Sequence, residues 1–443
     1  MIRVLFLMVF LSIPFVATSK YMAIECANLN TYLKYLQKSE KGILEQHPNC
    51  NAAAIKKAYS SETHKEKWIK EIESPYQAYF GHPSSIFRDC ENCASSVPFY
   101  KIPSQAQRKA KKHVLVLSID GGGVKGLIPA RILQYIEKKT GKKISEIFDV
   151  FVGTSTGGLI VLFLNTPTED GGAAYTASDL VKMYRELPFI IFSNPNPLRR
   201  LRSIKGIITS KYSAKPYEQL LKKYFKNIGM AQSLNPVLVT SVDIETQTPF
   251  EFSTFSAVRG DQENFFMWEA ARATSAAPVY FKPYKLQTEE GTLTLVDGGV
   301  GINNPSLLGI GLAKRLYPKA KILFVSLSTQ VSEVKNKFKT SGPLGGGALS
   351  LTRGGTNITA IIHNLLQVPA RNAERLAERL LTTEGSTYIR IATEENEARP
   401  IPLDDSSPAS MDKLEKIATR MIKRNQQLKK LVKILPLYIQ EKE

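Results

Sequence analysis

The pattern of apolar and polar positions changes near residue 112 and divides the chain into two parts. Before this point apolar residues recur at helical spacing, so residues 20–112 are predicted to be a mostly helical region that ends in a basic linker, 98–112. After it, short apolar and β-branched runs alternate with amphipathic segments. The runs predict strands at 113–119, 147–152, 236–243, 292–296 and 321–327, and the amphipathic segments predict helices at 127–139, 158–164, 306–316 and 372–381. This alternation predicts an α/β domain with a mainly parallel central sheet.

The N-terminal segment has the pattern of a secretory signal peptide. A basic residue, Arg3, precedes an apolar run from Val4 to Ala17, and small residues at Ala17 and Ser19 suit cleavage after Ser19. A retained signal anchor is the alternative, but a comfortable membrane span needs about 20 apolar residues. We therefore expect residues 1–19 to be removed and the protein to be exported, to a secreted or periplasmic destination.

All four cysteines lie in the predicted N-terminal helical region: Cys26, Cys50, Cys90 and Cys93. In an oxidising compartment Cys26–Cys50 and Cys90–Cys93 are candidate disulfides, although four cysteines allow three pairings. The Cys90-Glu91-Asn92-Cys93 segment also fits a redox pair or half of a zinc site. Its flanks are loop-like, whereas a redox motif is expected between a strand and a helix, so a structural bridge is favoured.

The clearest chemical motif is Gly153-Thr154-Ser155-Thr156-Gly157, which follows a predicted strand and precedes an apolar helical run. A nucleophile elbow has this spacing, because its serine sits on a strained turn and the flanking glycines let strand and helix pack closely. The turn also places the hydroxyl at a helix N-terminus, where N–H groups favour developing negative charge. A chance Gly-Ser turn is the alternative. The strand-before, helix-after context favours Ser155 as a nucleophile supported by Gly153 and Gly157.

A second motif, Asp120-Gly121-Gly122-Gly123-Val124-Lys125-Gly126, follows the predicted strand 113–119. Its spacing fits a dinucleotide-binding loop, but such a site ends its second strand in an acidic residue, and here that strand ends in the Ser155 turn. Backbone N–H groups of a glycine-rich loop also form oxyanion holes. Lys125 either adds positive charge nearby or points to solvent. The candidate oxyanion-hole residues are Gly121, Gly122, Gly123 and Gly126.

The third motif, Val296-Asp297-Gly298-Gly299, ends the predicted strand 292–296. An Asp-Gly pair on its own more often marks a turn. With a serine nucleophile in the chain, Asp297 becomes the candidate general base, and Gly298 and Gly299 would let another backbone approach it. A Ser–His–Asp triad is the rival. Only His363 follows Asp297 in the order of α/β-hydrolases, and its apolar surroundings predict a helix or strand rather than a catalytic loop.

Together these motifs resemble the patatin-like family of lipid acyl hydrolases. Residues 118–126 resemble the family's oxyanion motif, with lysine at position 125 where arginine is usual. Residues 153–158 resemble its nucleophile elbow, and residues 273–281 are similar to the stretch that precedes the family's aspartate. Residues 297–305 match the last motif, with Ile302 where alanine is common.

The resemblance implies a fold and a mechanism. The fold would be a patatin-like three-layer sandwich around a mainly parallel sheet over residues 113–425, with the small Cys-containing helical region before it and a basic helical tail, 426–443, after it. Ser155 would attack a carboxylic ester of a (phospho)lipid, Asp297 would accept its proton, and water would hydrolyse the resulting acyl-enzyme. The loop 121–126 would hold the oxyanion. This chemistry requires no metal or cofactor.

Composition and charge bear on partners more than on chemistry. The 443-residue chain carries 59 Lys+Arg against 40 Asp+Glu, a formal net charge of +19, which favours association with anionic surfaces. Residues 411–435 form a basic amphipathic pattern that either packs its apolar stripe on the domain or lies on an anionic membrane. Nucleic acid is not an expected partner, since zinc-finger spacing and RNP-like motifs are lacking. We expect an acyl-lipid substrate and peripheral contact with an anionic membrane; a catalytically silent lipid- or polyanion-binding protein is the alternative, and protein partners are not predicted.

Overall fold

The computed structural model describes residues 97–192, 210–330, 358–393 and 401–441, with side-chain detail from residue 368 onward in the third range. All structural statements below refer to these residues. The predicted signal peptide, the helical region up to residue 96 and the four cysteines lie outside the described residues, so the predictions for them stay predictions.

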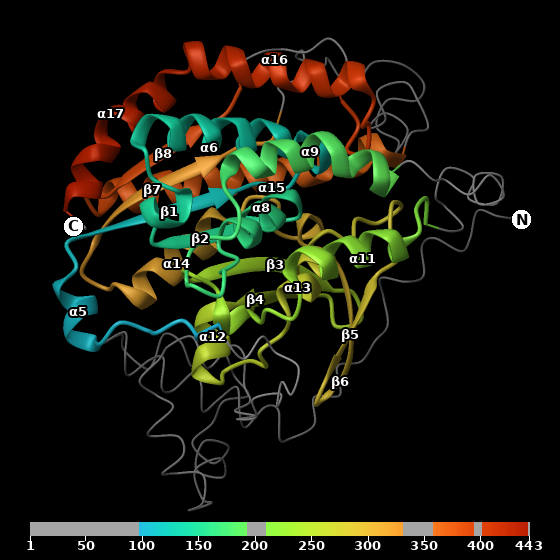
Figure 1. Cartoon of the computed structure of the whole chain (residues 1–443), viewed down its shortest axis with the longest axis horizontal. Coiled ribbons are helices and arrows are strands. Elements are labelled where there is room, and N and C mark those ends of the chain that lie inside the picture. The colour runs from blue at the N-terminus through green and yellow to red at the C-terminus, as the bar shows by residue number, and fades with distance from the viewer. Residues whose placement is uncertain (1–96, 193–209, 331–357, 394–400, 442–443) are drawn as a thin grey trace, which may run out of the picture. The chain divides into compact units, whose positions relative to one another are not determined.

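A mixed sheet forms the centre of the described part of the chain, with the strand order β5-β6-β3-β2-β1-β7-β8 (Figure 1). Five strands run parallel: β1 His113–Ile119, β2 Val150–Thr154, β3 Val237–Asp243, β7 Lys321–Leu327 and β8 Thr387–Ile391. Both β4 Thr248–Ser253 and β6 Gly291–Asp297 run antiparallel to β3, and β5 Tyr284–Thr288 runs antiparallel to β6. The prediction of an α/β fold with a mainly parallel sheet is confirmed.

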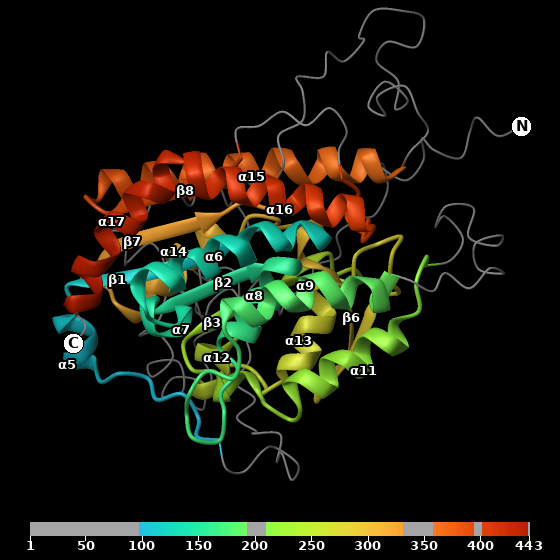
Figure 2. The ribbon, with the colours of Figure 1, turned by 45° about the horizontal axis from the view of Figure 1, so that its top comes forward.

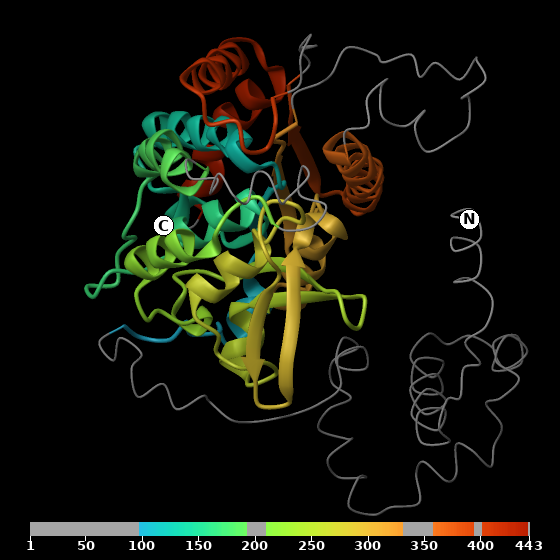
Figure 3. The same cartoon turned by 90° about the vertical axis from the view of Figure 1, so that its right-hand side faces the viewer.

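Helices cover both faces of the sheet and make three layers, seen with the sheet nearly edge-on in Figure 3. Because side chains alternate along a strand, Leu115 and Leu117 of β1 face one layer while Val114 and Val116 face the other. The first layer contains α6 Leu127–Thr140, α8 Thr156–Leu164, α13 Met267–Thr274, α16 Pro408–Arg424 and α17 Gln426–Gln440. The second contains α14 Ser306–Leu316 and α15 Ile358–Thr383.

Two further helices, α9 Ala177–Phe192 and α11 Ala214–Phe225, pack against each other on the first layer (Figure 2). They extend the apolar core beyond the sheet, since Leu180 of α9 and Leu221 of α11 are buried in the same cluster as α8. The shorter elements are α5 Gln105–Ala110, α7 Ile144–Ile147, α12 Thr254–Arg259 and the 3₁₀ turns η1 Gly123–Gly126, η3 Met230–Gln232 and η4 Gly298–Val300.

Several predicted elements differ from the structure at their ends. The strand predicted at 147–152 begins at Val150, because residues 144–147 form the short helix α7. The helix predicted at 372–381 is part of the longer α15, which continues through Pro369. Part of the predicted linker is the helix α5. The side chain of its N-cap residue, Ser104, accepts from the N–H of Gln107, and the Gln107 side chain accepts from the N–H of Ser104.

The basic amphipathic pattern at 411–435 forms two helices rather than one. Asn425 separates α16 from α17 and caps α17 by accepting from the N–H of Leu428 at 2.9 Å. The apolar stripe packs on the domain, as the first of the two interpretations predicted: the buried residues are Leu414, Ile417, Met421, Leu428, Leu431 and Leu435. The basic side chains Lys429, Lys430 and Lys433 remain exposed. Among the described residues, no helix combines the length and the apolar content needed to cross a membrane.

Candidate active site

Ser155 lies at the tight turn between β2 and α8. Its backbone has φ 53° and ψ −122°, a conformation that L-residues rarely adopt and that nucleophile elbows use. The flanking glycines permit this turn, because a Cβ at Gly157 would overlap the carbonyl of Ile119 and one at Gly153 would overlap the backbone at Gly157. The N–H of Ser155 donates to Thr274 Oγ1 at 2.8 Å and so fixes the turn against α13.

The Ser155 hydroxyl donates a hydrogen bond to Asp297 Oδ2 at 2.6 Å. The sheet register brings the two residues together. Along β3, Thr240 pairs with Thr154 of β2, and the next residue, Ser241, pairs with Asp297 at the end of β6. A nucleophile and a carboxylate from distant parts of the sequence therefore meet at the carboxyl ends of β2 and β6.

Asp297 is buried, with 6% of its surface exposed, and burial raises its pKa to about 6. Two hydrogen bonds oppose that rise by stabilising the carboxylate, one from Ser155 and one from the N–H of Gly299 to Oδ1 at 2.7 Å. Gly298 is packed so closely that a Cβ would overlap the Thr240 carbonyl. The carboxylate is thus held in place and is ionised near neutral pH.

The glycine-rich loop lies beside Ser155, because Ile119 of β1 pairs with Gly153 of β2. Gly121 is held on both sides: its N–H donates to the Asn303 carbonyl at 3.1 Å, and its own carbonyl accepts from the Thr329 hydroxyl. In the described part of the chain the N–H groups of Gly122 and Gly123 have no protein acceptor. Gly126 packs where a Cβ would overlap Thr156 Oγ1.

A buried ion pair holds the start of this loop. Asp120, which is fully buried, accepts from Arg390 of β8 through both carboxylate oxygens, with an Nη1–Oδ1 distance of 2.9 Å. Arg390 also donates to Ser326 of β7 at 2.6 Å. The bidentate pair connects β1 to β8 across β7 at the point where the glycine-rich loop begins.

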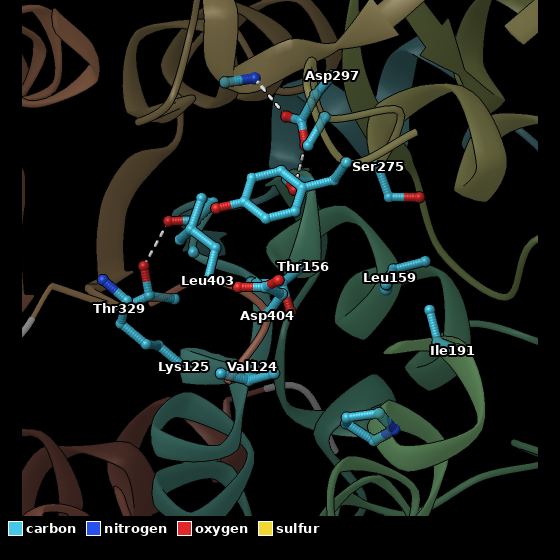
Figure 4. Close-up of a pocket in the computed structure, with 18 of the residues that line it drawn as sticks. Val124, Lys125, Thr156, Leu159, Ile191, Ser275, Asp297, Thr329, Leu403 and Asp404 are labelled. Atoms are coloured by element: carbon cyan, nitrogen blue, oxygen red, sulfur yellow. Dashed lines mark hydrogen bonds between the residues drawn. The ribbon is translucent and has the colours of Figure 1, made fainter. Parts of the chain in front are cut away.

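An apolar cavity opens in front of Ser155 and Asp297 (Figure 4). Its walls come mainly from α8, α9 and α11, and the lining includes Leu159, Phe163, Leu180, Met183, Leu187, Ile191, Leu220 and Leu221. Ser155, Asp297 and residues of the glycine-rich loop also line this cavity. Lys125 is buried and lines the cavity, so the interpretation that it points to solvent is wrong.

Sequence motifs identified some of these residues and missed others. Thr274 supports the nucleophile turn, Thr329 and Asn303 hold Gly121, and Arg390 pairs with Asp120. Thr274 and Asn303 fall inside the stretches that carried the family resemblance. Thr329 follows β7 and Arg390 lies in β8, and both are outside those stretches. The one available signal for them was a polar residue near the carboxyl end of a strand.

Comparison with known proteins identifies the family of this chain. The family model for patatin-like phospholipase matches residues 117–308. Patatin-like protein 2 of Arabidopsis thaliana is 30% identical over 341 residues, which cover 70% of this chain and 83% of that protein. Patatin group M-2 of Solanum tuberosum is 28% identical over 349 residues, covering 71% and 85%. The chain therefore belongs to the patatin-like phospholipase family.

A solved structure, that of VipD from Legionella pneumophila, is also similar to this chain. It shares 14% sequence identity, with coverage of 73% of this chain and 70% of that chain, and the TM-score is 0.27. The family assignment rests on the sequence matches and on the motifs described above.

Proposed function

We propose that the protein is a lipid acyl hydrolase that cleaves carboxylic ester bonds of phospholipids through Ser155 and Asp297. The observation that carries the proposal is the hydrogen bond of 2.6 Å from the Ser155 hydroxyl to a buried carboxylate, both of which line an apolar cavity. Membership of the patatin-like phospholipase family supports a lipid hydrolase.

In the proposed first step, Asp297 accepts the hydroxyl proton while Ser155 Oγ forms a bond to the ester carbonyl carbon. The tetrahedral intermediate collapses, the bond to the leaving alcohol breaks, and protonated Asp297 returns its proton to that oxygen. Water then attacks the carbonyl carbon of the acyl-enzyme and gives its proton to Asp297. The bond to Ser155 Oγ breaks, Asp297 returns the proton to this oxygen, and the fatty acid is released. A pKa of about 6 suits Asp297 for both proton transfers near neutral pH.

We assign stabilisation of the oxyanion to the N–H groups of Gly122 and Gly123. Gly121 shares the predicted motif, but its N–H is occupied by the Asn303 carbonyl. Gly126 packs against Thr156, which gives it a structural reason to be glycine. In comparable sites one oxyanion-hole donor contributes about 2.7–4 kcal/mol to transition-state stabilisation.

The cavity favours an acyl chain as the bound group. Leu159 and Phe163 lie four residues apart on α8 and therefore line one face of the helix that starts at Ser155. Together with α9 and α11 they offer an apolar path that leads away from the nucleophile, and desolvating the chain supplies binding energy of about 0.8 kcal/mol per methylene.

The Ser155 hydroxyl donates directly to the Asp297 carboxylate, the contact that a Ser–Asp dyad requires, and this favours the dyad over a triad with His363. His363 lies within the helix α15, where the sequence predicted a helix or strand rather than a catalytic loop. We expect His363→Asn to retain most of the activity. Loss of activity to the level of Ser155→Ala would contradict the dyad.

Contact with the membrane is proposed at the mouth of the cavity. The exposed basic face of α17 is less suited, because Glu441 pairs with His113 at the start of β1, the end of the sheet opposite Ser155. Three exposed apolar side chains lie at the cavity instead: Val300 belongs to its lining, and Phe189 and Ile190 lie in α9 between the lining residues Pro188 and Ile191. Phe189→Ser with Ile190→Ser should slow hydrolysis of vesicles and leave hydrolysis of a soluble ester unchanged. Equal effects on both would contradict this orientation. Action after export, at an anionic membrane, also remains our proposal.

The test of the function is release of fatty acid from phosphatidylglycerol and phosphatidylcholine vesicles by the mature protein. Ser155→Ala and Asp297→Asn should abolish release, and His363→Asn serves as the matched control. Vesicle binding with equal, background-level release from all four proteins would refute the hydrolase and support the alternative, a silent lipid-binding protein.

A further inference from the structure

Residues 401–405 lie directly on the glycine-rich loop and form a strap across it. The Leu403 carbonyl accepts a hydrogen bond from the N–H of Val124 at 2.9 Å. Gly123 has φ 59°, and a Cβ there would overlap the same carbonyl. The position of Leu403 therefore determines where the backbone of Gly123 and Val124 can lie.

The next residue of the strap, Asp404, anchors it to another part of the fold. Its carboxylate has 8% of its surface exposed and accepts from the Tyr212 hydroxyl at 2.6 Å and from Lys211 Nζ. It also lines the cavity, and Figure 4 shows it beside Leu403. The pair Leu403–Asp404 thus connects the glycine-rich loop to the segment that precedes α11.

That segment is itself well held. The N–H groups of Lys211 and Tyr212 donate to the carbonyls of Val279 and Tyr280, both at 2.8 Å. The Tyr212 ring is buried and packs on Phe192, with ring centroids 5.1 Å apart. Tyr212 is therefore a fixed point from which a hydrogen bond can hold the strap.

The loop that receives these bonds also supports the proposed base. The Ala276 carbonyl, in the same loop as Val279 and Tyr280, accepts from the N–H of Asp297 at 3.1 Å. One continuous set of hydrogen bonds therefore runs from Asp297 through residues 276–280 and Tyr212 to Asp404, and from Leu403 to the glycine-rich loop.

We propose that Asp404 is a positioning residue for the oxyanion side of the reaction. It touches no reacting atom, and it acts through Leu403 by keeping the N–H groups of the glycine-rich loop at a fixed place relative to Ser155 and Asp297. The proposal rests on the proposed hydrolase function. We assign the positioning of the strap to the hydrogen bond from Tyr212. The ion pair with Lys211 contributes less, because the Lys211 side chain is 45% exposed and solvent weakens the pair.

The experiment compares four single variants, Asp404→Ala, Asp404→Asn, Tyr212→Phe and Asp405→Asn, and the double variant Asp404→Ala with Tyr212→Phe. Asp405 is the matched control, because it belongs to the same strap but bonds Ser410 Oγ at 2.6 Å and the N–H of Ser407 at the start of α16. Asparagine at 404 keeps an acceptor for the Tyr212 hydroxyl and so tests the hydrogen bond apart from the charge. Each variant is assayed with a soluble short-chain aryl ester, and backbone hydrogen exchange is followed in residues 120–127.

We expect Asp404→Ala to lower kcat roughly 10- to 100-fold with KM nearly unchanged, because a donor misplaced by about 1 Å loses transition-state contact. Hydrogen exchange in residues 120–127 should become faster. Asp404→Asn should retain most of kcat, Asp405→Asn should match the wild type in both measurements, and the double variant Asp404→Ala with Tyr212→Phe should be no worse than Asp404→Ala alone. The pH midpoint of kcat should stay unchanged in all variants, since Asp297 is untouched.

Unchanged kcat and unchanged exchange in Asp404→Ala would overturn the proposal, and so would equal losses in Asp404→Ala and Asp405→Asn. The exchange measurement separates this inference from the proposed function. A wild type without Ser155-dependent turnover would refute the hydrolase, while faster exchange confined to the Asp404 and Tyr212 variants would still support the strap as the element that holds the loop.

Discussion

Ser155 Oγ lies 2.6 Å from Asp297 Oδ2, although 142 residues separate them in the chain. Ser155 directly follows β2, and Asp297 is the last residue of β6. Both strands pair with β3 and not with each other. The distance between nucleophile and carboxylate is therefore set by consecutive residues of β3, Thr240 and Ser241. A rigid central strand gives this pair a precision that two loops would lack.

The first prediction concerns the pH dependence of activity. Asp297 must be ionised to accept the Ser155 proton, and burial raises its pKa to about 6. We therefore expect kcat/KM for a soluble ester to rise with pH through a single ionisation near 6 and to be constant above it. A midpoint near 4, as for an exposed carboxyl, would contradict the role of Asp297; the midpoint should not move in His363→Asn.

The second prediction links the same group to stability. Because the pKa of Asp297 is raised from 3.8 to about 6 on folding, its contribution to stability is fully present below pH 3.8 and is lost as the pH rises through 6. The loss is about 3 kcal/mol at neutral pH. Asp297→Asn cannot ionise, so its Tm relative to the wild type should be higher at pH 8 than at pH 4. A difference in Tm that is independent of pH would show that Asp297 is not strained by burial.

The third prediction concerns Gly123. Alanine there would adopt φ 59° and overlap the Leu403 carbonyl, so Gly123→Ala should cost more than about 2 kcal/mol of stability and at least about tenfold in kcat. Gly141 is the matched control: its φ is 70°, but open space surrounds it. Gly141→Ala should cost about 1–2 kcal/mol from backbone strain alone and leave kcat unchanged. Urea unfolding and ester hydrolysis measure the two effects, and equal behaviour of both variants would contradict the role of the strap contact.

The fourth prediction concerns the buried ion pair. Arg390→Met leaves Asp120 buried without its partner, which should cost about 3–5 kcal/mol in the free energy of unfolding. The double variant Arg390→Met with Asp120→Asn should recover part of that loss, because no unpaired charge remains. Additive destabilisation of the two single variants would show that the pair does not interact as the structure indicates.

The sequence predicted the parts of the fold that have strong patterns. The buried strands β1, β3 and β7 are continuous apolar runs, and their bounds agree with the prediction to within a residue. Strands β4, β5 and β8 were not predicted. β5 has Leu286 as its one buried residue, and β4 is exposed over its first half, so neither carries enough apolar signal to stand out.

The site was predictable where its chemistry depends on short motifs. The elbow motif and the Asp-Gly-Gly motif led to Ser155 and Asp297 as candidates, because the close packing at Gly153, Gly157 and Gly298 leaves no room for a side chain. Asp404 and Arg390 could not be recognised in the same way. Each contributes through hydrogen bonds to a residue far away in the sequence, Tyr212 and Asp120, and only the folded chain shows that these residues meet.

The central claim is that Ser155 is the nucleophile and that Asp297 activates it. Its most direct test is the reaction of the purified protein with a lipid-like fluorophosphonate, with the modified residue located by peptide mass and the rate followed for each variant. We expect one adduct on Ser155, no adduct in Ser155→Ala, and a rate at least about 100-fold lower in Asp297→Asn. An adduct on another residue, or a rate in Asp297→Asn equal to that of the wild type, would contradict the account.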